Sequence, residues 1–182
     1  MDYKRLSKTI AYALRHAPAE YGLELDEEGW VQVKDLLAAL RPRRREWQTL
    51  TQDDLVMMVE RASKSRYELQ DGRIRALYGH SVPNRIPKEP SEPPEILYHG
   101  TSPEAVNIIL AEGLKPMQRQ YIHLAADQET AHRVGSRKSS RPVLLKIHAL
   151  EAHRAGIAFY HGNDETWLAD IVPPQFIERP ID

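Results

Sequence analysis

Two histidines are candidates for binding a nucleotide: His99 in the run His99-Gly100-Thr101, and His123 in Tyr121-Ile-His-Leu124. We expect each to lie at or just after the end of a short strand, where its side chain can face a cleft. An imidazole can donate a hydrogen bond to a ribose hydroxyl or a pyrophosphate, and Gly100 would let a ligand approach the backbone. For either histidine taken alone, a structural role is the commoner one.

Several other chemistries have no basis in the sequence. The chain has no Cys, which excludes disulfides, thiol catalysis and iron–sulfur clusters. It has no GxGxxG or GxxxxGK[ST] motif, so a Rossmann or P-loop phosphate site is not expected. HxxxH and HExxH spacings are also missing, and no metal site is expected. The remaining histidines with no partner pattern are expected to be surface or structural residues: His132, His148, His153 and His161.

The basic residues allow two interpretations at this stage. The run from Arg41 to Arg45 is most simply a solvated loop, and a contact with a phosphate backbone is the alternative. Arg15, near the end of an expected helix, reads on its own as a cation that stabilises the helix dipole.

The composition describes a folded protein. The chain has 182 residues, 41% hydrophobic and 28% charged, with 25 Lys+Arg against 26 Asp+Glu. The net charge of −1 excludes a globally basic nucleic-acid binder but leaves room for a local basic patch. No apolar run resembles a signal peptide or approaches the roughly 20 residues of a membrane span. We therefore expect a cytoplasmic protein. As a separate expectation, we predict a monomer.

A proline-rich stretch divides the chain. Residues 83–94 contain five prolines, which exclude a helix or a central strand and favour a stiff, extended linker. The predicted organisation is a lobe at residues 1–82, the linker at 83–94 and a second lobe at 95–182.

The first lobe reads as three helices followed by a hairpin. Apolar residues at helical spacing predict a helix over 3–16, and a second, short helix is expected at 34–40. Thr51 and Asp54 resemble a capping box that opens a third helix. Asp71-Gly72 is a strong hairpin signal. This order is that of a winged helix, a module that often binds nucleic acid.

The second lobe alternates short strands with short helices. Strands are expected at 96–98, 121–124, 143–147 and 157–160. Ser102 and Asp127 are expected to cap the two intervening helices, which Gly113 and Gly135 would close. The predicted fold class for the whole chain is α+β.

Several fragments, spread over nearly the whole chain, are informative through their order and spacing rather than singly. These are Leu6-Ser-Lys8, Leu14-Arg-His16, Asp26-Glu-Glu-Gly-Trp30, Ser65-Arg-Tyr67, Ile74-Arg-Ala-Leu-Tyr-Gly-His-Ser81, Leu97-Tyr-His-Gly-Thr101, Arg119-Gln-Tyr-Ile-His-Leu124 and Val134-Gly-Ser-Arg137. In these fragments the sequence resembles the RNA 2′-phosphotransferases, which use NAD.

The resemblance implies a two-lobed enzyme. A winged-helix lobe would hold RNA with an internal 2′-phosphate, as left by one type of tRNA splicing, and an ADP-ribosyltransferase-like lobe would hold NAD as co-substrate. The family's catalytic tetrad falls on Arg15, His16, Arg66 and Arg119. The implied NAD-binding residues are His99, Gly100, Thr101, His123, Asp127, Gly135 and Arg137. The implied reaction passes through an ADP-ribosylated 2′-phosphate and yields 2′-OH RNA, nicotinamide and ADP-ribose 1″,2″-cyclic phosphate.

The chemistry of the tetrad suits this substrate. A phosphate monoester carries a charge of about −1.5 to −2 at neutral pH. Arginine binds phosphate oxygens in pairs through a planar fork that is always charged. His16 titrates in a useful range and is the candidate proton donor.

The sequence departs from the family pattern at two positions and leaves one role open. Tyr78 stands where the family commonly has Gln, and Ala125 stands where it commonly has Ser. The loss of the hydroxyl at Ala125 is expected to alter NAD affinity rather than abolish binding. Glu165 and Thr166 lie near the place where many ADP-ribosyltransferases carry a glutamate, and their role stays open.

Two alternatives accompany this interpretation. The chain could be an ADP-ribosyltransferase that modifies terminal phosphates of nucleic acids or a protein side chain, which would leave a persistent adduct. It could also be a winged-helix binding module without catalytic activity, in which case the tetrad residues would be scattered over the surface.

Overall fold

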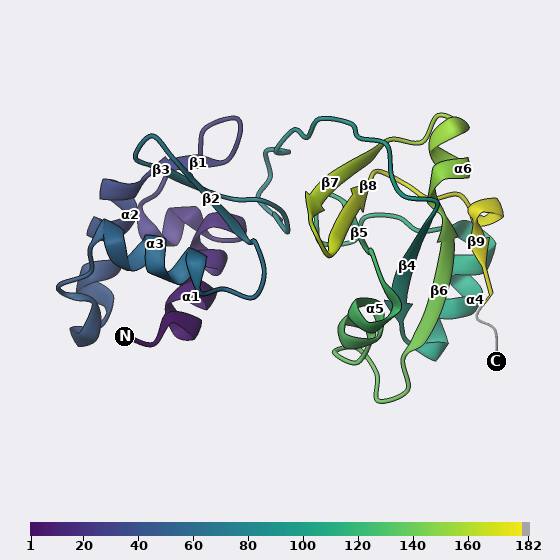
Figure 1. Cartoon of the computed structure of the whole chain (residues 1–182), viewed down its shortest axis with the longest axis horizontal. Coiled ribbons are helices and arrows are strands. Elements are labelled where there is room, and N and C mark those ends of the chain that lie inside the picture. The colour runs from purple at the N-terminus through teal and green to yellow at the C-terminus, as the bar shows by residue number, and fades with distance from the viewer. Residues whose placement is uncertain (180–182) are drawn as a thin grey trace. The chain divides into compact units, whose positions relative to one another are not determined.

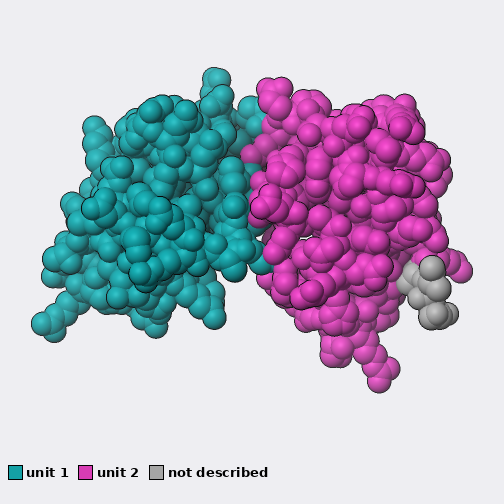
Figure 2. All heavy atoms as spheres, viewed as in Figure 1, with its two compact units in different colours: residues 1–87 teal, residues 88–182 magenta. Residues whose placement is uncertain are grey.

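The computed structural model describes residues 1–179, and the chain divides into two compact units (Figures 1 and 2). The first unit is Met1–Pro87 and the second begins at Lys88. The described residues contain α-helices and two antiparallel sheets, which confirms the predicted α+β class. Within residues 1–179, no helix is long and apolar enough to cross a membrane.

The elements of the first unit are α1 (Tyr3–Arg15), β1 (Trp30–Gln32), α2 (Val33–Leu40), α3 (Gln52–Glu60), β2 (Tyr67–Gln70) and β3 (Arg73–Ala76), with short 3₁₀ turns at Pro18–Tyr21, Arg41–Arg43 and Arg45–Trp47. Those of the second unit are β4 (Ile96–Thr101), α4 (Pro103–Glu112), β5 (Ile122–Ala125), α5 (Gln128–Gly135), β6 (Val143–His148), α6 (Ala149–Arg154), β7 (Phe159–Asn163), β8 (Thr166–Ala169) and β9 (Ile177–Glu178), with a 3₁₀ turn at Pro174–Phe176.

Helix α1 forms because its apolar residues recur on one face. Four of them are buried in the core of the first unit: Leu6, Ile10, Ala13 and Leu14. The Asp2 carboxylate accepts a hydrogen bond from the Arg5 N–H at 3.0 Å and caps the N-terminus. The helix ends at Arg15, one residue short of the expectation. The opposite face of α1 is left polar.

The remaining elements of the first unit follow local signals. The capping box is present at the start of α3, where Thr51 and Asp54 exchange hydrogen bonds. Asp71 and Gly72 have φ of 50° and 71° and join β2 to β3, as the Asp-Gly signal predicts. Strand β1 completes a sheet of order β1-β3-β2. The short strand β1 was not predicted.

The two ends of the proline-rich stretch pack on different units. Ile86 is buried in the first unit, where its side chain lies beside Gly29. Pro90 forms an isolated bridge with Tyr160, and the Ser91 N–H donates to the Phe159 carbonyl at 2.8 Å. The chain thus leaves one unit and joins the other within the predicted linker.

The second unit is built on a six-stranded sheet of order β7-β8-β5-β4-β6-β9. In the described residues, β4 and β5 pair only at Tyr98 opposite Ala125, and the two halves of the sheet diverge from there (Figure 1). By contrast, β4 pairs with β6 along its whole length, up to Thr101 opposite Val143. Apolar side chains of both halves form one core, which includes Leu97, Leu124, Leu145, Ile147 and Phe159.

This pairing corrects the expectation that the strand ends before His99. Strand β4 runs to Thr101, and His99 lies within it, because pairing with β6 holds the backbone extended through Gly100. His123 likewise lies inside β5, at its second position. A second correction concerns α4: Ser102 is its N-cap residue, but its side chain makes no capping hydrogen bond.

Candidate functional site

The end of α1 places Arg15 and His16 at the edge of a groove. Arg15 is the last residue of the helix, and His16 is its C-cap, with its N–H donating to the Tyr12 carbonyl at 3.0 Å. Pro18 follows and prevents the helix from continuing. The two candidate catalytic residues therefore leave α1 side by side, where a cation is also favourable to the helix dipole.

The segment after β3 returns to this helix end and holds both side chains. The Ser81 N–H donates to the Arg15 carbonyl at 2.9 Å, and Ser81 Oγ lies 2.8 Å from His16 Nδ1. The guanidinium carbon of Arg15 lies 4.9 Å from the centroid of the Tyr78 ring, a cation–π distance. Gly79 has φ of 91°, and a Cβ built there would lie 3.4 Å from the Arg15 side chain. The positive φ, which L side chains rarely adopt, is what favours a glycine here.

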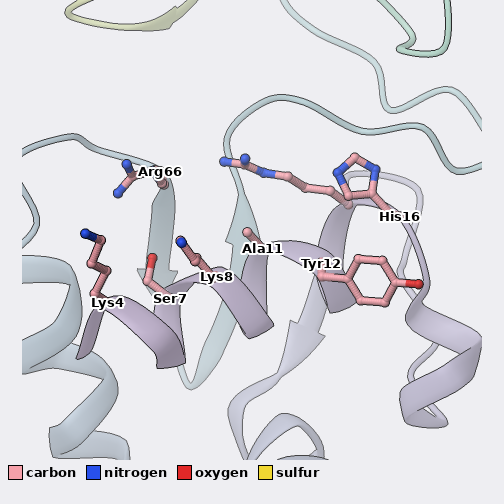
Figure 3. Close-up of a pocket in the computed structure, with 8 residues that line it drawn as sticks. Lys4, Ser7, Lys8, Ala11, Tyr12, His16 and Arg66 are labelled. Carbon is pink, nitrogen blue, oxygen red and sulfur yellow. The ribbon is translucent and has the colours of Figure 1, made fainter. Parts of the chain in front are cut away.

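Arg66 joins the same groove because Tyr67 anchors the start of β2 on α1. The Tyr67 hydroxyl donates to the Ser7 carbonyl and also lies 3.2 Å from Ser7 Oγ. The Arg66 carbonyl accepts from the Leu77 N–H at 2.9 Å. The arginine, one residue before Tyr67, is thereby fixed beside the helix (Figure 3).

Arg15 has an environment that favours an anionic partner. Burial lowers the pKa of its guanidinium; the charge of Arg66 acts in the same direction, and Tyr67 and Tyr78 oppose it. Its Nε and Nη2 are buried and make no hydrogen bond within residues 1–179. A buried charged donor without an acceptor is costly, and a phosphate oxygen in the groove would supply one.

The groove itself has a volume of about 340 Å³. None of the residues that line it is acidic, and five carry a cationic or titratable nitrogen. The lining consists of Lys4, Ser7, Lys8, Ala11, Tyr12, Arg15, His16 and Arg66. The structure therefore brings together three of the four predicted catalytic residues, all from the first unit. Arg119 belongs to the second unit, where it precedes β5, and its catalytic role stays a prediction.

In the second unit, the two candidate histidines make hydrogen bonds to backbone carbonyls. His99 Nδ1 donates to the His123 carbonyl at 3.2 Å, and His123 Nδ1 donates to the Tyr121 carbonyl at 3.1 Å. Since a carbonyl can only accept, Nδ1 of each ring carries a proton. His99 thus occupies the place where β4 and β5 cease to pair.

His99 is neutral at physiological pH. Burial, together with the positive charge of Lys138, lowers its pKa to about 4, against the opposing hydrogen bond to His123. The pKa of Lys138 is in turn lowered by burial and by the charge of Arg119. These three nitrogen-bearing side chains therefore share one neighbourhood of the second unit. With Nδ1 engaged, His99 Nε2 is the acceptor that a ribose hydroxyl could use.

The remaining predicted NAD-binding residues have visible structural roles. A Cβ on Gly100 would overlap the Ala131 carbonyl of α5, and it would lie 2.9 Å from the Gly135 N. A Cβ on Gly135 would lie 2.8 Å from Pro142 Cβ. These two glycines let α5 pack closely on β4. The group that closely approaches the Gly100 backbone is therefore helix α5. Whether a ligand also uses this backbone stays a prediction.

The other three members of that set lie near the same helix. Asp127 caps α5, accepting from the Thr130 N–H at 2.7 Å and the Thr130 hydroxyl at 2.9 Å. Thr101 is buried at the end of β4, and Arg137 is exposed just after α5. Their roles toward NAD stay predictions.

Two features left open by the sequence now have structural partners. Glu165 forms an ion pair with Arg133 of α5, with Oε2 and Nη2 2.9 Å apart. In the basic run, Arg41 donates twice to the Leu50 carbonyl, and Arg43 stacks on Tyr21 at 3.9 Å. These contacts favour a structural role for both features. In the described residues, no group of three or more His, Cys, Asp and Glu side chains could hold a metal ion.

Sequence reasoning missed Lys4 and Lys8 as members of the groove. The signal was available, because positions 4, 8, 11 and 15 share one face of a helix. It also treated Tyr78 only as a departure from a family pattern, whereas its ring supports Arg15. That contact joins residues 63 positions apart and could not be read from local spacing.

The fold and the groove define a two-unit α+β protein with a cationic site that suits a phosphate group. Over residues 2–171 the chain matches the family described as RNA 2'-phosphotransferase, Tpt1 / KptA family. The chain belongs to this RNA 2′-phosphotransferase family.

Relatives from bacteria and archaea match nearly the whole chain. A probable RNA 2'-phosphotransferase of Acetivibrio thermocellus is 55% identical over 177 residues, which cover 97% of each chain. One from Bacillus thuringiensis subsp. konkukian is 51% identical, over 96% of this chain and 94% of the relative. A probable RNA 2'-phosphotransferase 2 of Archaeoglobus fulgidus is 41% identical, over 97% and 80%.

Proposed function

We propose that this protein removes an internal 2′-phosphate from RNA by transferring it to NAD. In this proposal the first unit is a winged-helix lobe that holds the RNA. The second unit is an ADP-ribosyltransferase-like lobe that holds NAD. The 2′-phosphate in this proposal is of the type that one kind of tRNA splicing leaves at the splice junction.

One observation carries the proposal: Arg15, His16 and Arg66 line a single groove, and two nitrogens of Arg15 are buried there without a hydrogen bond in the described residues. A phosphate monoester of about −1.5 to −2 charge needs several cationic donors. Two guanidinium forks and an imidazole meet that need more specifically than scattered surface charges would. Membership of the family supplies the identity of the anion as an RNA 2′-phosphate.

The second unit offers groups that suit NAD. A neutral His99 has Nε2 as an acceptor for a ribose hydroxyl, because its Nδ1 is bonded to His123. Lys138 and Arg119 provide positive charge near His99 that would stabilise a pyrophosphate or a transferring phosphoryl group. This donor set is consistent with a dinucleotide co-substrate.

The first step forms a covalent bond between the two substrates. An oxygen of the RNA 2′-phosphate attacks the anomeric carbon of the nicotinamide ribose. The glycosidic C–N bond breaks, and its electron pair leaves with nicotinamide, which becomes neutral. The protein mainly orients the pair and balances charge, since NAD itself supplies the leaving group. Arg15 and Arg66 would hold the attacking phosphate.

The second step returns the RNA hydroxyl. The ribose 2″-hydroxyl attacks the phosphorus, and the bond between phosphorus and the RNA 2′-oxygen breaks. The products are ADP-ribose 1″,2″-cyclic phosphate and RNA with a 2′-hydroxyl. The proton lost by the 2″-hydroxyl is balanced by the one gained by the RNA 2′-oxygen, which His16 is placed to donate. The three arginines of the tetrad, Arg15, Arg66 and Arg119, would stabilise the charge on the transferring phosphoryl group.

Incubation with NAD and an oligonucleotide that carries one internal 2′-phosphate tests the proposal. We expect nicotinamide and dephosphorylated RNA to appear in equal amounts. A matched oligonucleotide with a 2′-hydroxyl at that position should release no nicotinamide. A persistent ADP-ribosyl adduct as the end product would instead favour the alternative ADP-ribosyltransferase, and the absence of any NAD consumption would refute both.

A further inference from the structure

The polar face of α1 carries a line of basic residues that extends from Arg15 toward the N-terminus of the helix. Lys4, Lys8, Ala11 and Arg15 follow one another at intervals of four, three and four residues, which keeps them on one face of the helix. Lys4 and Lys8 are exposed, and both line the same groove as Arg15. Figure 3 shows the labelled Lys4, Lys8 and Arg66 side chains on one side of the helix.

The lysines are too far along the helix to share one phosphate with Arg15. At a rise of 1.5 Å per residue, Lys8 lies about 10 Å from Arg15 along the axis, and Lys4 about 16 Å. The small Ala11 between them adds no bulk to the groove, and no acidic residue lines it. The groove therefore extends beyond the end formed by Arg15 and His16, and cationic side chains line it along its whole length.

An aromatic ring borders the same groove. Tyr12 is 44% exposed, and its hydroxyl donates to Glu20 at 3.0 Å, which fixes the ring. The ring lies next to His16, with centroids 6.2 Å apart. A cationic groove with an exposed, fixed aromatic side chain is the arrangement by which proteins bind single-stranded nucleic acid, with phosphates on the cations and a base stacked on the ring.

We infer that Lys4 and Lys8 form a binding subsite for backbone phosphates of the RNA strand next to the 2′-phosphate, and that Tyr12 stacks on a neighbouring base. This inference rests on the proposed function and extends it from the reacting phosphate to the strand that carries it. The enzyme would thus prefer a single-stranded segment of several nucleotides over a minimal dinucleotide.

The test compares two substrates that share the same internal 2′-phosphate: a dinucleotide and a single-stranded decanucleotide. For the double variant Lys4→Ala/Lys8→Ala we expect KM for the decanucleotide to rise about tenfold or more, and kcat/KM for the dinucleotide to stay within about twofold. The salt slope of decanucleotide affinity should fall by about 1.4, since each single-strand phosphate contact contributes about 0.7. Lys34→Ala, an exposed lysine on α2 outside the groove, is the matched control.

A second variant tests the stacking. Tyr12→Ala should weaken decanucleotide binding by about fivefold or more, and Tyr12→Phe should weaken it clearly less, because the ring face is kept and only the bond to Glu20 is lost. Equal effects on both substrates, or none on the decanucleotide, would overturn the inference while wild-type activity stands. If the wild-type protein converts neither substrate in the presence of NAD, the proposed function itself fails.

Discussion

The imidazole of His16 is held by the hydroxyl of Ser81, with Nδ1 and Oγ 2.8 Å apart, although 65 positions separate the two residues. The Ser81 N–H also bonds the carbonyl of Arg15, so one residue fixes both the helix end and the ring that leaves it. This makes Ser81 a positioning residue for the proposed proton donor.

Ser81→Ala should lower kcat while leaving KM for NAD unchanged. One hydrogen bond contributes about 0.5–1.5 kcal/mol, which corresponds to a loss of about 2- to 10-fold. Because Ser81 is exposed, the melting temperature should change little. Ser81→Thr keeps the hydroxyl and should restore most of the rate. Wild-type kcat in the alanine variant would contradict the positioning role.

Tyr78 should matter because its side chain supports Arg15 in two ways. Its ring lies 4.9 Å from the Arg15 guanidinium carbon, a cation–π contact worth about 0.5–2 kcal/mol, and its hydroxyl makes a hydrogen bond with the guanidinium. Steady-state kinetics should show kcat/KM for phosphorylated RNA reduced about 2- to 30-fold in Tyr78→Ala, and reduced less in Tyr78→Phe, which keeps the ring and loses the hydroxyl. Wild-type kcat/KM in Tyr78→Ala would contradict the supporting role.

His99 should make folding weaker as the pH falls from about 6.5 toward 4. Its folded pKa is about 4, below the ordinary 6.5, so in this window the unfolded chain binds a proton that the folded chain does not. The free energy of unfolding should fall by at most on the order of 3 kcal/mol over this window. Above pH 6.5 the ring is neutral in both states, and none of this stability is lost. Urea unfolding at pH 4.5 to 7.5 should show the stability difference between wild type and His99→Gln growing with pH. A pH-independent difference would contradict a neutral His99 in the folded protein.

Gly100→Ala should destabilise the second unit. The added Cβ would overlap the Ala131 carbonyl, a backbone atom that can move only if α5 shifts off β4. Overpacking of this kind costs about 1–3 kcal/mol. The control is Gly156→Ala, where no atom lies within 4 Å and only the positive φ of 100° is strained. Thermal unfolding should show the larger loss for Gly100→Ala, and an equal or smaller loss would refute tight packing at this glycine.

Local signals in the sequence predicted much of the fold. The capping box at Thr51 and Asp54 and the hairpin at Asp71-Gly72 are both confirmed, because each depends on residues within one turn. Strand β1 was missed because its three residues gain their order from β3, where Trp30 lies opposite Arg75. The extent of β4 through His99 depends in the same way on pairing with β6.

The site was predictable only where residue chemistry and family resemblance coincided. Arg15, His16 and Arg66 were assigned from the resemblance, and their presence in one groove is a property of the folded first unit. The packing at Gly100 depends on Ala131, and the support of Arg15 depends on Tyr78, so neither could be derived from neighbouring residues. Lys4 and Lys8 could have been found from helical spacing alone.

The most direct test of the central claim follows a radioactive 2′-phosphate in a single turnover with NAD. We predict that the label leaves the RNA and appears in ADP-ribose cyclic phosphate. In His16→Ala, transfer should slow at least tenfold and labelled ADP-ribosylated RNA should accumulate, because His16 acts in the second step. In Arg15→Lys, which keeps the charge and loses the fork, transfer should also slow at least tenfold. Label that the wild-type protein leaves on the RNA or releases as inorganic phosphate, or wild-type transfer in both variants, would contradict the claim.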